Sequence, residues 1–212
     1  MSFLEETLRY MGIRSHTADE NLVRDIERME HEARALSSFR SVSRACTLSC
    51  AEDHVTIDSM QIQSRDLAQY LSGCESALLI AGTMGAAADT FIRTATYQGM
   101  LKANIAQAVM TALIEEHLDE MTASLQCEYV GQSFTMRISP GYGDFPLAHQ
   151  TWLIQTLDAT RRIGISLNES LMMIPQKSVT AIIGVEPHIN ENRHTHKCEH
   201  CSKTDCAFRE EI

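Results

Sequence analysis

The sequence lacks long hydrophobic runs and an excess of positive charge. Its longest stretch with few polar groups, residues 77–88, is too short and too rich in glycine, threonine and alanine to span a bilayer. The start, MSFLEETLRY, has neither the basic nor the apolar segment of a signal peptide. The 18 basic and 28 acidic side chains leave a formal charge of -10, which repels nucleic-acid phosphates and anionic membranes. We therefore expect a cytoplasmic protein that binds neither nucleic acid nor a membrane.

Internal repeats and low-complexity tracts are also missing from the sequence. A chain of 212 residues with 44% hydrophobic content is close in length to one domain and can enclose a core. Seven cysteines are an odd number, and without a secretory signal they favour reduced thiols or a metal site over a disulfide framework. We expect one domain over residues 1–187 and a separate tail over residues 188–212. Cys46 and Cys50 lie on a predicted strand and are expected to be core thiols.

Hydrophobic periodicity predicts both helices and strands. The predicted helices follow the capping residues Ser2, Thr17 and Ser64 and cover residues 85–125, with a break at Gly99, and 147–163, with an end at Gly164. The predicted strands cover residues 42–48, 55–57, 76–82, 134–138 and 178–185. Because strands and helices do not alternate as βαβ units, we predict an α+β fold with a mainly antiparallel, twisted sheet flanked by helices.

A loop rich in proline and glycine, RISPGYGDFP, extends from Arg137 to Pro146. Arg137 offers a planar guanidinium that suits a carboxylate, and Tyr142 offers an aromatic face. A ligand that has a carboxylate together with a cation or a flat base would match this pair. The alternative is a tight turn with a solvated arginine, which the pattern alone favours.

A second segment, residues 163–184, reads IGISLNESLMMIPQKSVTAIIG. Glu169 is its one carboxylate, among apolar and hydroxyl side chains. A core strand preceded by a helix end explains the pattern without any function, and a functional role for Glu169 is the alternative.

Three stretches of the sequence resemble the activation domain of cobalamin-dependent methionine synthase. They are RISPGYGDFPLAHQ, IGISLNES and MMIPQKSVTA. The family's motifs run R-x-x-P-G-Y, then G-[IM]-x-L-T-E-S, then a methionine, a proline and an S-V segment. Three blocks in the same order and at similar separation are more specific than any one of them. The motifs cover residues 137–184, and a looser similarity in helix pattern extends the match upstream to residue 81.

The resemblance implies that the protein binds S-adenosylmethionine. It also implies that the bound methyl group is presented to a cobalamin oxidised to the cob(II) state, which one electron and the methyl group return to methylcobalamin. By position in the motifs, Arg137 should hold the methionine carboxylate of the ligand. The other residues that the resemblance assigns to the site are Ile138, Ser139, Gly141 and Tyr142 in the pocket wall and Glu169, which should shape it.

The same resemblance implies a partner. The D-x-H-x-x-G motif of a cobalamin-binding module is absent, so the cobalamin should be carried by a separate methionine synthase or another corrinoid protein. The electron donor is not identified. The sequence also departs from the family, since Asn168 replaces a threonine and the paired tyrosines after the last motif have no match. A module that senses S-adenosylmethionine or metal without chemistry is therefore an alternative, as is a zinc-stabilised interaction protein.

Cysteine and histidine are concentrated in the C-terminal tail, where Cys198, Cys201, Cys206 and His200 lie within nine positions. Three thiolates with a nearby histidine suit tetrahedral zinc. Three thiolates alone can hold an iron-sulfur cluster that takes its fourth ligand from elsewhere, and such a cluster could supply the electron. A disordered tail with incidental thiols is the alternative.

Overall fold

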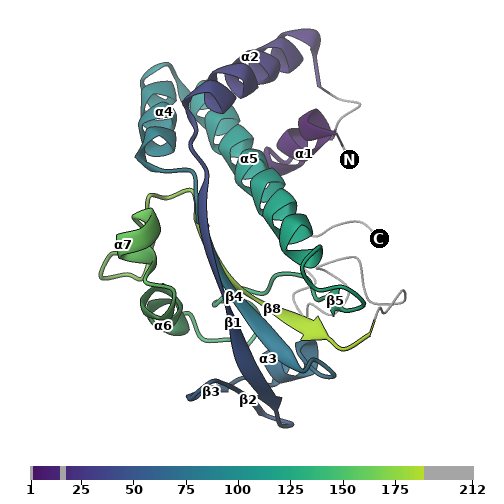
Figure 1. Ribbon diagram of the computed structural model, residues 1–212. Helices are drawn as coiled ribbons and strands as arrows, with labels where there is room; N and C mark the ends of the chain where they lie inside the picture. The colour runs from purple at the N-terminus through teal and green to yellow at the C-terminus, as the bar shows by residue number, and fades with distance from the viewer. Residues whose placement is uncertain (1, 15–17, 189–212) are drawn as a thin grey trace.

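The main sheet has six strands, and each strand runs antiparallel to its neighbours in the order β3-β2-β1-β4-β8-β5. The computed structural model describes residues 2–14 and 18–188 (Figure 1). The strands of the sheet are β1 (Arg40–Cys50), β2 (His54–Ile57), β3 (Met60–Gln63), β4 (Ser76–Thr83), β5 (Ser133–Phe134) and β8 (Ser178–Glu186). A separate hairpin pairs β6 (Ser166–Leu167) with β7 (Met173–Ile174). The predicted α+β class and antiparallel sheet are confirmed.

Seven helices are found in the described part of the chain. They are α1 (Phe3–Tyr10), α2 (Glu20–Leu36), α3 (Arg65–Tyr70), α4 (Ala86–Tyr97), α5 (Met100–Gln126), α6 (His149–Thr156) and α7 (Ala159–Ile163). Figure 1 shows α1 and α5 on one side of the long strands, and α6 and α7 on the other. The buried side chains of α2 and α4 belong to the same core cluster as those of α1 and α5. The predicted flanking of the sheet by helices is therefore confirmed.

The core has two halves, one on each face of the sheet. Along β4, Leu78 and Ile80 point into the half formed with α2, α4 and α5, whereas Leu79 and Ala81 point into the half formed with α6 and α7. Successive side chains of a strand point to opposite faces, so a strand covered on both faces is apolar at almost every position. This explains why SALLIAG is a continuous apolar run.

Two local predictions about helices needed correction. The second helix begins at Glu20, because the Asp19 side chain accepts a hydrogen bond from the Leu22 amide and so acts as the N-cap; the predicted cap, Thr17, lies outside the described residues. The predicted helix over residues 147–163 is divided into α6 and α7, because Asp158 adopts a left-handed conformation with φ of 50°. Gly164 ends α7 in the left-handed conformation, as predicted.

Three predictions about the strands also needed correction. β3 was not predicted, although Ile62 is fully buried in it. The predicted strand over residues 134–138 pairs with β8 only at Ser133–Phe134 and through one bridge between Ile138 and Ile182. Cys46 is a core thiol, as predicted, but Cys50 is exposed because it lies at the end of β1.

Among the residues that the structure describes, no helix combines the length and the apolar character needed to cross a bilayer.

Candidate functional site

Arg137 points toward the face of α5 that carries Glu115, Asp119 and Thr122. Its Nη2 donates a hydrogen bond to Glu115 Oε2 at 2.8 Å, and its Nη1 forms an ion pair with Asp119 Oδ1 at 2.7 Å. Nη1 also donates to Thr122 Oγ1 at 3.3 Å. These three residues lie on one face of α5 because helical positions four and three apart stack along the axis. The arginine therefore binds carboxylates in this structure, and both belong to the chain itself.

The loop that follows Arg137 is attached to the middle of β8 through Ile138. The Ile138 amide donates to the Ile182 carbonyl at 3.0 Å, and the Ile182 amide donates to the Ile138 carbonyl at 2.8 Å. Beyond it the chain turns back, with the Gly141 amide donating to the Phe145 carbonyl at 2.8 Å. Phe145 is fully buried, so the turn is held at both ends. Such anchoring fixes the backbone path between the two prolines.

Asp144 ties the same loop to the start of α3. Its carboxylate accepts hydrogen bonds from the Ser64 hydroxyl, the Arg65 amide at 2.8 Å and the Asp66 amide at 3.1 Å. Partial burial opposes ionisation, but these hydrogen bonds hold the pKa of the Asp144 carboxyl below its ordinary value. Gly143 packs so closely here that a Cβ atom would lie 2.0 Å from Asp66 Oδ2. Position 143 thus requires glycine, because the Asp66 carboxylate leaves no room for a side chain.

The predicted wall residues share this loop but differ in exposure. Ile138 is buried, Ser139 is half-buried, Gly141 is exposed, and Tyr142 is 50% exposed. The Ser139 carbonyl accepts a hydrogen bond from the Tyr142 amide at 3.2 Å, which closes the first part of the turn. The exposed ring of Tyr142 leaves an aromatic face available to a flat partner.

Glu169 lies on the exposed turn between β6 and β7. This turn is linked to the region after the loop, because Gln150 Nε2 donates to the Leu171 carbonyl at 2.8 Å. Within residues 2–14 and 18–188, no hydrogen bond or ion pair joins Glu169 itself to the Arg137–Pro146 loop. The turn depends on Asn168, whose Oδ1 accepts from the amides of Ser170 at 3.0 Å and Met172 at 2.9 Å. The asparagine that replaces the family's threonine therefore closes this turn.

The sequence analysis did not identify Lys177, although it is the one lysine in residues 163–184. Its Nζ donates to the Gln107 carbonyl at 3.1 Å and to Thr111 Oγ1 at 2.7 Å, both on α5. Burial lowers the pKa of Lys177 to about 8. The adjacent Gln176 amide donates to the Asp89 carboxylate of α4 at 3.0 Å. The MMIPQKSVTA motif thus connects α4 and α5 to the start of β8.

Tyr10 at the end of α1 lies close enough to Glu115 for that carboxylate to influence its ionisation. Burial, together with the negative charges of Glu115 and Glu6, raises the pKa of the Tyr10 phenol well above its ordinary value. No sequence signal connects α1 with α5, because only packing brings these helices together. The N-terminal helix therefore contributes to the surroundings of Arg137.

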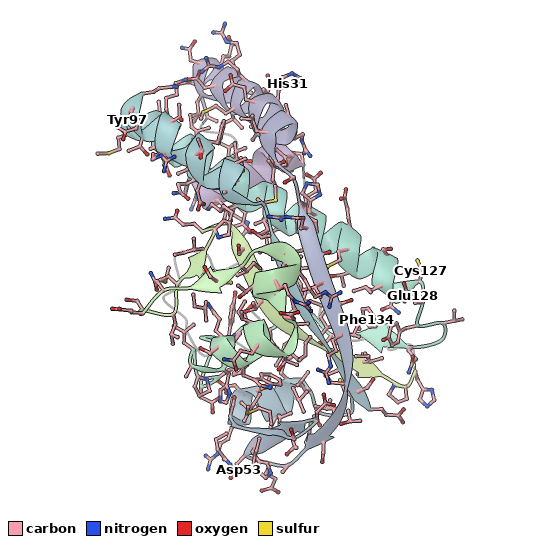
Figure 2. All side chains as sticks on the ribbon, turned by 60° about the vertical axis from the view of Figure 1, so that its left-hand side comes forward. His31, Asp53, Tyr97, Cys127, Glu128 and Phe134 are labelled. Atoms are coloured by element: carbon pink, nitrogen blue, oxygen red, sulfur yellow. The ribbon has the colours of Figure 1, made fainter. Side chains whose placement is uncertain are left out.

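A surface groove of about 520 Å³ lies elsewhere, along β1 between α5 and α7. Its lining residues are Phe39, Ser41, Val42, Ser43, His117, Glu120, Met121, Ser124, Leu125 and Arg162. Figure 2, in which β1 comes forward, shows this strand in front of α5, with the end of α5 at Cys127 and Glu128 near Phe134. The groove contains none of the predicted ligand-binding residues.

No group of three or more metal-ligating side chains occurs in the described part of the chain. The predicted metal ligands Cys198, Cys201, Cys206 and His200 lie outside the described residues.

The fold and the site define an α+β protein with a carboxylate-binding arginine beside a proline- and glycine-rich loop. Residues 84–207, more than half of the chain, match the model of the family described as "Vitamin B12 dependent methionine synthase, activation domain". The chain belongs to this family, and the matched range includes both the Arg137 loop and the three tail cysteines. No curated protein matches the chain.

A solved structure described as the MetH reactivation domain bound to AdoHcy has a similar fold. It aligns with a TM-score of 0.56 and 15% sequence identity, over 81% of this chain and 69% of that one. At this identity the likeness concerns the fold alone, and the ligand named is that of the other protein.

Proposed function

We propose that this protein binds S-adenosylmethionine at the Arg137–Pro146 loop and supports reductive methylation of cob(II)alamin carried by a separate protein. The partner is a cobalamin-dependent methionine synthase or a related corrinoid methyltransferase. The observation that carries the proposal is the state of Arg137, whose side chain is only 10% exposed and binds two carboxylates at 2.7 and 2.8 Å. The arginine occupies the position of the family's motif that binds the carboxylate of the ligand.

Binding requires an exchange of partners at Arg137. A guanidinium has five N–H donors, so the ligand's carboxylate can take the remaining donors or displace one carboxylate of α5. Ile138 and Asp144 hold the loop in position through the bonds described above, which lowers the entropy lost on binding. Tyr142, with its half-exposed ring, would face the adenine, and Ser139 and Gly141 would complete the wall. Glu169 would shape the site from the β6–β7 turn, a role supported by the Gln150–Leu171 hydrogen bond.

The reaction needs one electron from a donor that is not part of this chain, and the methyl group of S-adenosylmethionine. The test mixes the protein with a corrinoid protein in the cob(II) state, a chemical one-electron reductant and S-adenosylmethionine. We expect the visible spectrum to change to that of methylcobalamin, and the change to be abolished or greatly slowed without this protein. Conversion at the same rate without it, across several corrinoid proteins, would contradict the proposal.

A sensing module without chemistry is the second candidate. It is favoured by one specific observation, the absence of the family's paired tyrosines after Val185. A sensor would bind S-adenosylmethionine in a titration but would leave the corrinoid spectrum unchanged in the same mixture.

We further propose that Cys198, Cys201, Cys206 and His200 bind a metal. Three thiolates and an imidazole suit zinc, and the three thiolates alone suit an iron-sulfur cluster completed from elsewhere. The proposal is supported by the spacing of the residues and by the extension of the family match to residue 207.

A further inference from the structure

One edge of β1 is left unpaired over much of its length. Residues 40–47 pair with β4 on one side, but on the other side β2 pairs only with residues 48–50. In the part of the chain that the structure describes, no strand pairs with residues 40–46 on that second side. An exposed strand edge presents backbone amides and carbonyls that can pair with another extended chain.

Thr47 shows which residues turn their backbone groups to this edge. On the side of β2, its amide donates to Asp58 Oδ1 at 3.0 Å and its carbonyl accepts from the Asp58 amide at 3.1 Å. Every second residue of an antiparallel strand directs its amide and carbonyl to the same edge. The amides and carbonyls of Ser41, Ser43 and Ala45 therefore point away from β4. Within residues 2–14 and 18–188 these groups have no hydrogen-bond partner.

The surface groove of about 520 Å³ lies along this free edge. The wall on the α5 side carries the apolar side chains of Phe39, Met121 and Leu125. The Phe39 ring stacks on the His117 ring with 5.1 Å between the centroids, which holds it in place. A chain laid along the edge would therefore turn every second side chain onto an apolar surface.

The wall on the α7 side carries positive charge. Arg162 lines the groove, and Arg40 reaches the end of α7, with its Nη2 3.6 Å from the position that a Cβ atom would take on Gly164. Neither arginine has an ion pair or a side-chain hydrogen bond among the described residues, whereas Arg44 pairs with Asp58 at 3.1 Å. Two guanidinium groups are thus free in a chain whose formal net charge is -10. Acidic side chains are the complementary partners.

We propose that the free edge of β1 binds an extended segment of a protein partner in which apolar and acidic residues alternate. The segment adds a strand beside residues 41–45 and pairs with the backbone of Ser41, Ser43 and Ala45. Successive side chains of a strand point to opposite faces, so the apolar ones meet the α5 wall and the acidic ones meet Arg40 and Arg162.

The two walls also set the register of the added strand. Glu120 belongs to the α5 wall, where it pairs with His117 at 3.2 Å. A shift by one residue would turn the acidic side chains toward Glu120 and the apolar ones toward the arginines. Recognition therefore requires alternation as well as negative charge. The inference does not depend on the proposed function, because no residue of the Arg137–Pro146 loop lines the groove.

A second copy of this chain suits the edge less well. Antiparallel pairing of two β1 strands would bring Arg40 and Arg44 of one copy beside the same arginines of the other. Neighbouring like charges on one face of a sheet are destabilising. The net charge of -10 on each copy adds to the repulsion.

The first experiment uses a capped, fluorescently labelled peptide of about eight residues in which valine and glutamate alternate. Fluorescence anisotropy measures its binding to the full-length chain at low salt. The matched control is a peptide of the same pattern with lysine in place of glutamate. We expect the glutamate peptide to bind, and the lysine peptide to bind at least about tenfold more weakly. Equal binding of the two peptides, or no binding of the glutamate peptide, overturns the proposal.

Ser43→Pro tests the free edge itself. The substitution removes one amide from the edge and places a ring in the path of the added strand. Proline is tolerated where the replaced amide faces solvent, so the pairing of β1 with β4 should survive, as a cooperative thermal transition would show. We expect the affinity for the glutamate peptide to fall by more than about tenfold. Ser43→Ala keeps the amide and should bind as the wild type does; equal affinities of the two variants contradict the proposal.

Arg162→Ala tests the α7 wall. It should weaken binding of the glutamate peptide by about twofold to fivefold, the range for an exposed ion pair. Arg161→Ala is the matched control, since Arg161 is the preceding residue, pairs with Asp158 at 2.5 Å and does not line the groove. We expect it to retain the wild-type affinity. Equal losses in both variants would assign the effect to overall charge and overturn the proposal.

Amide hydrogen exchange measured by NMR tests the geometry without any substitution. In the free chain, the amides of Ser41, Ser43 and Ala45 should exchange faster than those of Val42 and Arg44, which face β4, and should slow when the glutamate peptide is added. Slow exchange at the three positions in the free chain overturns the proposal, because the edge is then already covered. A rate that depends on protein concentration would identify a second copy as the cover, and a constant rate another segment of the same chain.

Discussion

Asp66 and Asp144, which are 78 residues apart, each accept a hydrogen bond from the backbone amide of the other. The Asp144 amide donates to Asp66 Oδ2 at 3.1 Å, and the Asp66 amide donates to Asp144 Oδ1 at 3.1 Å. This reciprocal pair fixes the loop after Arg137 to α3 on the far side of the sheet from α5. The proposed binding loop is therefore held from two directions, by α3 and by β8.

Removing the Asp144 carboxylate should loosen the loop, because the hydrogen bonds from Ser64, Arg65 and Asp66 are lost. We predict that Asp144→Ala lowers the free energy of unfolding by about 1 kcal/mol, as for the loss of a helix-capping side chain, discounted for exposure. It should also weaken ligand binding, because the loop would have to be ordered on binding. Denaturant titration measures the first effect and calorimetry the second. Asp53→Ala is the control, since the Asp53 side chain bonds its neighbour His54 and, among the described residues, makes no hydrogen bond to the Arg137–Pro146 loop. Equal losses in both variants would contradict the prediction.

The lowered pKa of Asp144 has a consequence at acid pH. The folded-state pKa lies below that of the unfolded chain, about 3.9, so the unfolded state binds more protons as the pH falls. The stabilisation is complete above the unfolded pKa and is lost as the pH falls through the folded one. As the pH falls below about 5, we expect the unfolding free energy to fall less steeply for Asp144→Asn than for the wild type. Parallel curves from denaturant titrations would show that Asp144 contributes nothing.

The buried Lys177 should affect the stability of the protein at alkaline pH. Burial lowers its pKa to about 8 in the folded protein, whereas the unfolded chain has a lysine pKa of about 10.4. Between these values the unfolded state binds more protons, so the stability of the wild type should rise with pH, by about 3 kcal/mol in all. Lys177→Met should lack this rise. Denaturant titrations from pH 7.5 to pH 10.5 measure the free energy of unfolding of both proteins. If it rises equally with pH in the wild type and in Lys177→Met, the pKa of Lys177 is not lowered by folding.

Arg137→Ala should weaken S-adenosylmethionine binding by about tenfold to over a hundredfold, because the ligand's carboxylate loses charge-assisted hydrogen bonds. Arg162→Ala is the control, since Arg162 lies in the groove along β1 and takes no part in the site. Calorimetric titration is the direct measurement. Equal affinities for the two variants and the wild type would remove Arg137 from the binding site.

Metal analysis of anaerobically purified protein tests the tail. We expect one zinc per chain in a colourless protein, or iron with a broad absorption in the visible blue that dithionite bleaches. Replacing Cys198 and Cys201 together by serine should abolish either signal, whereas Cys127→Ser, a change at an exposed cysteine at the end of α5, should retain it. A wild-type protein that carries neither metal would disprove the proposal.

Local patterns in the sequence determined much of the fold. The capping box of Ser2 and Glu5 and the N-cap of Ser64 are present as predicted, because each depends on residues three positions apart. Gly99 separates α4 from α5 with φ of 120°, a conformation that few other residues adopt. These features need only neighbouring residues, so the sequence is sufficient to show them. The motifs around Arg137 also identified the family.

The tertiary structure alone decided what surrounds those motifs. The carboxylate of Glu115 lies 22 positions from Arg137 in the sequence, on a helix whose rotation is set by packing against the sheet. The pairing of Ile138 with Ile182 fixes the position of Arg137 relative to β8, and no residue next to either isoleucine specifies that register. Only the tertiary structure likewise shows that Asp144 accepts hydrogen bonds from the first amides of α3, because those amides are distant in the sequence. The sequence by itself thus determined which groups can bind a carboxylate, whereas the partners of Arg137 depend on long-range contacts.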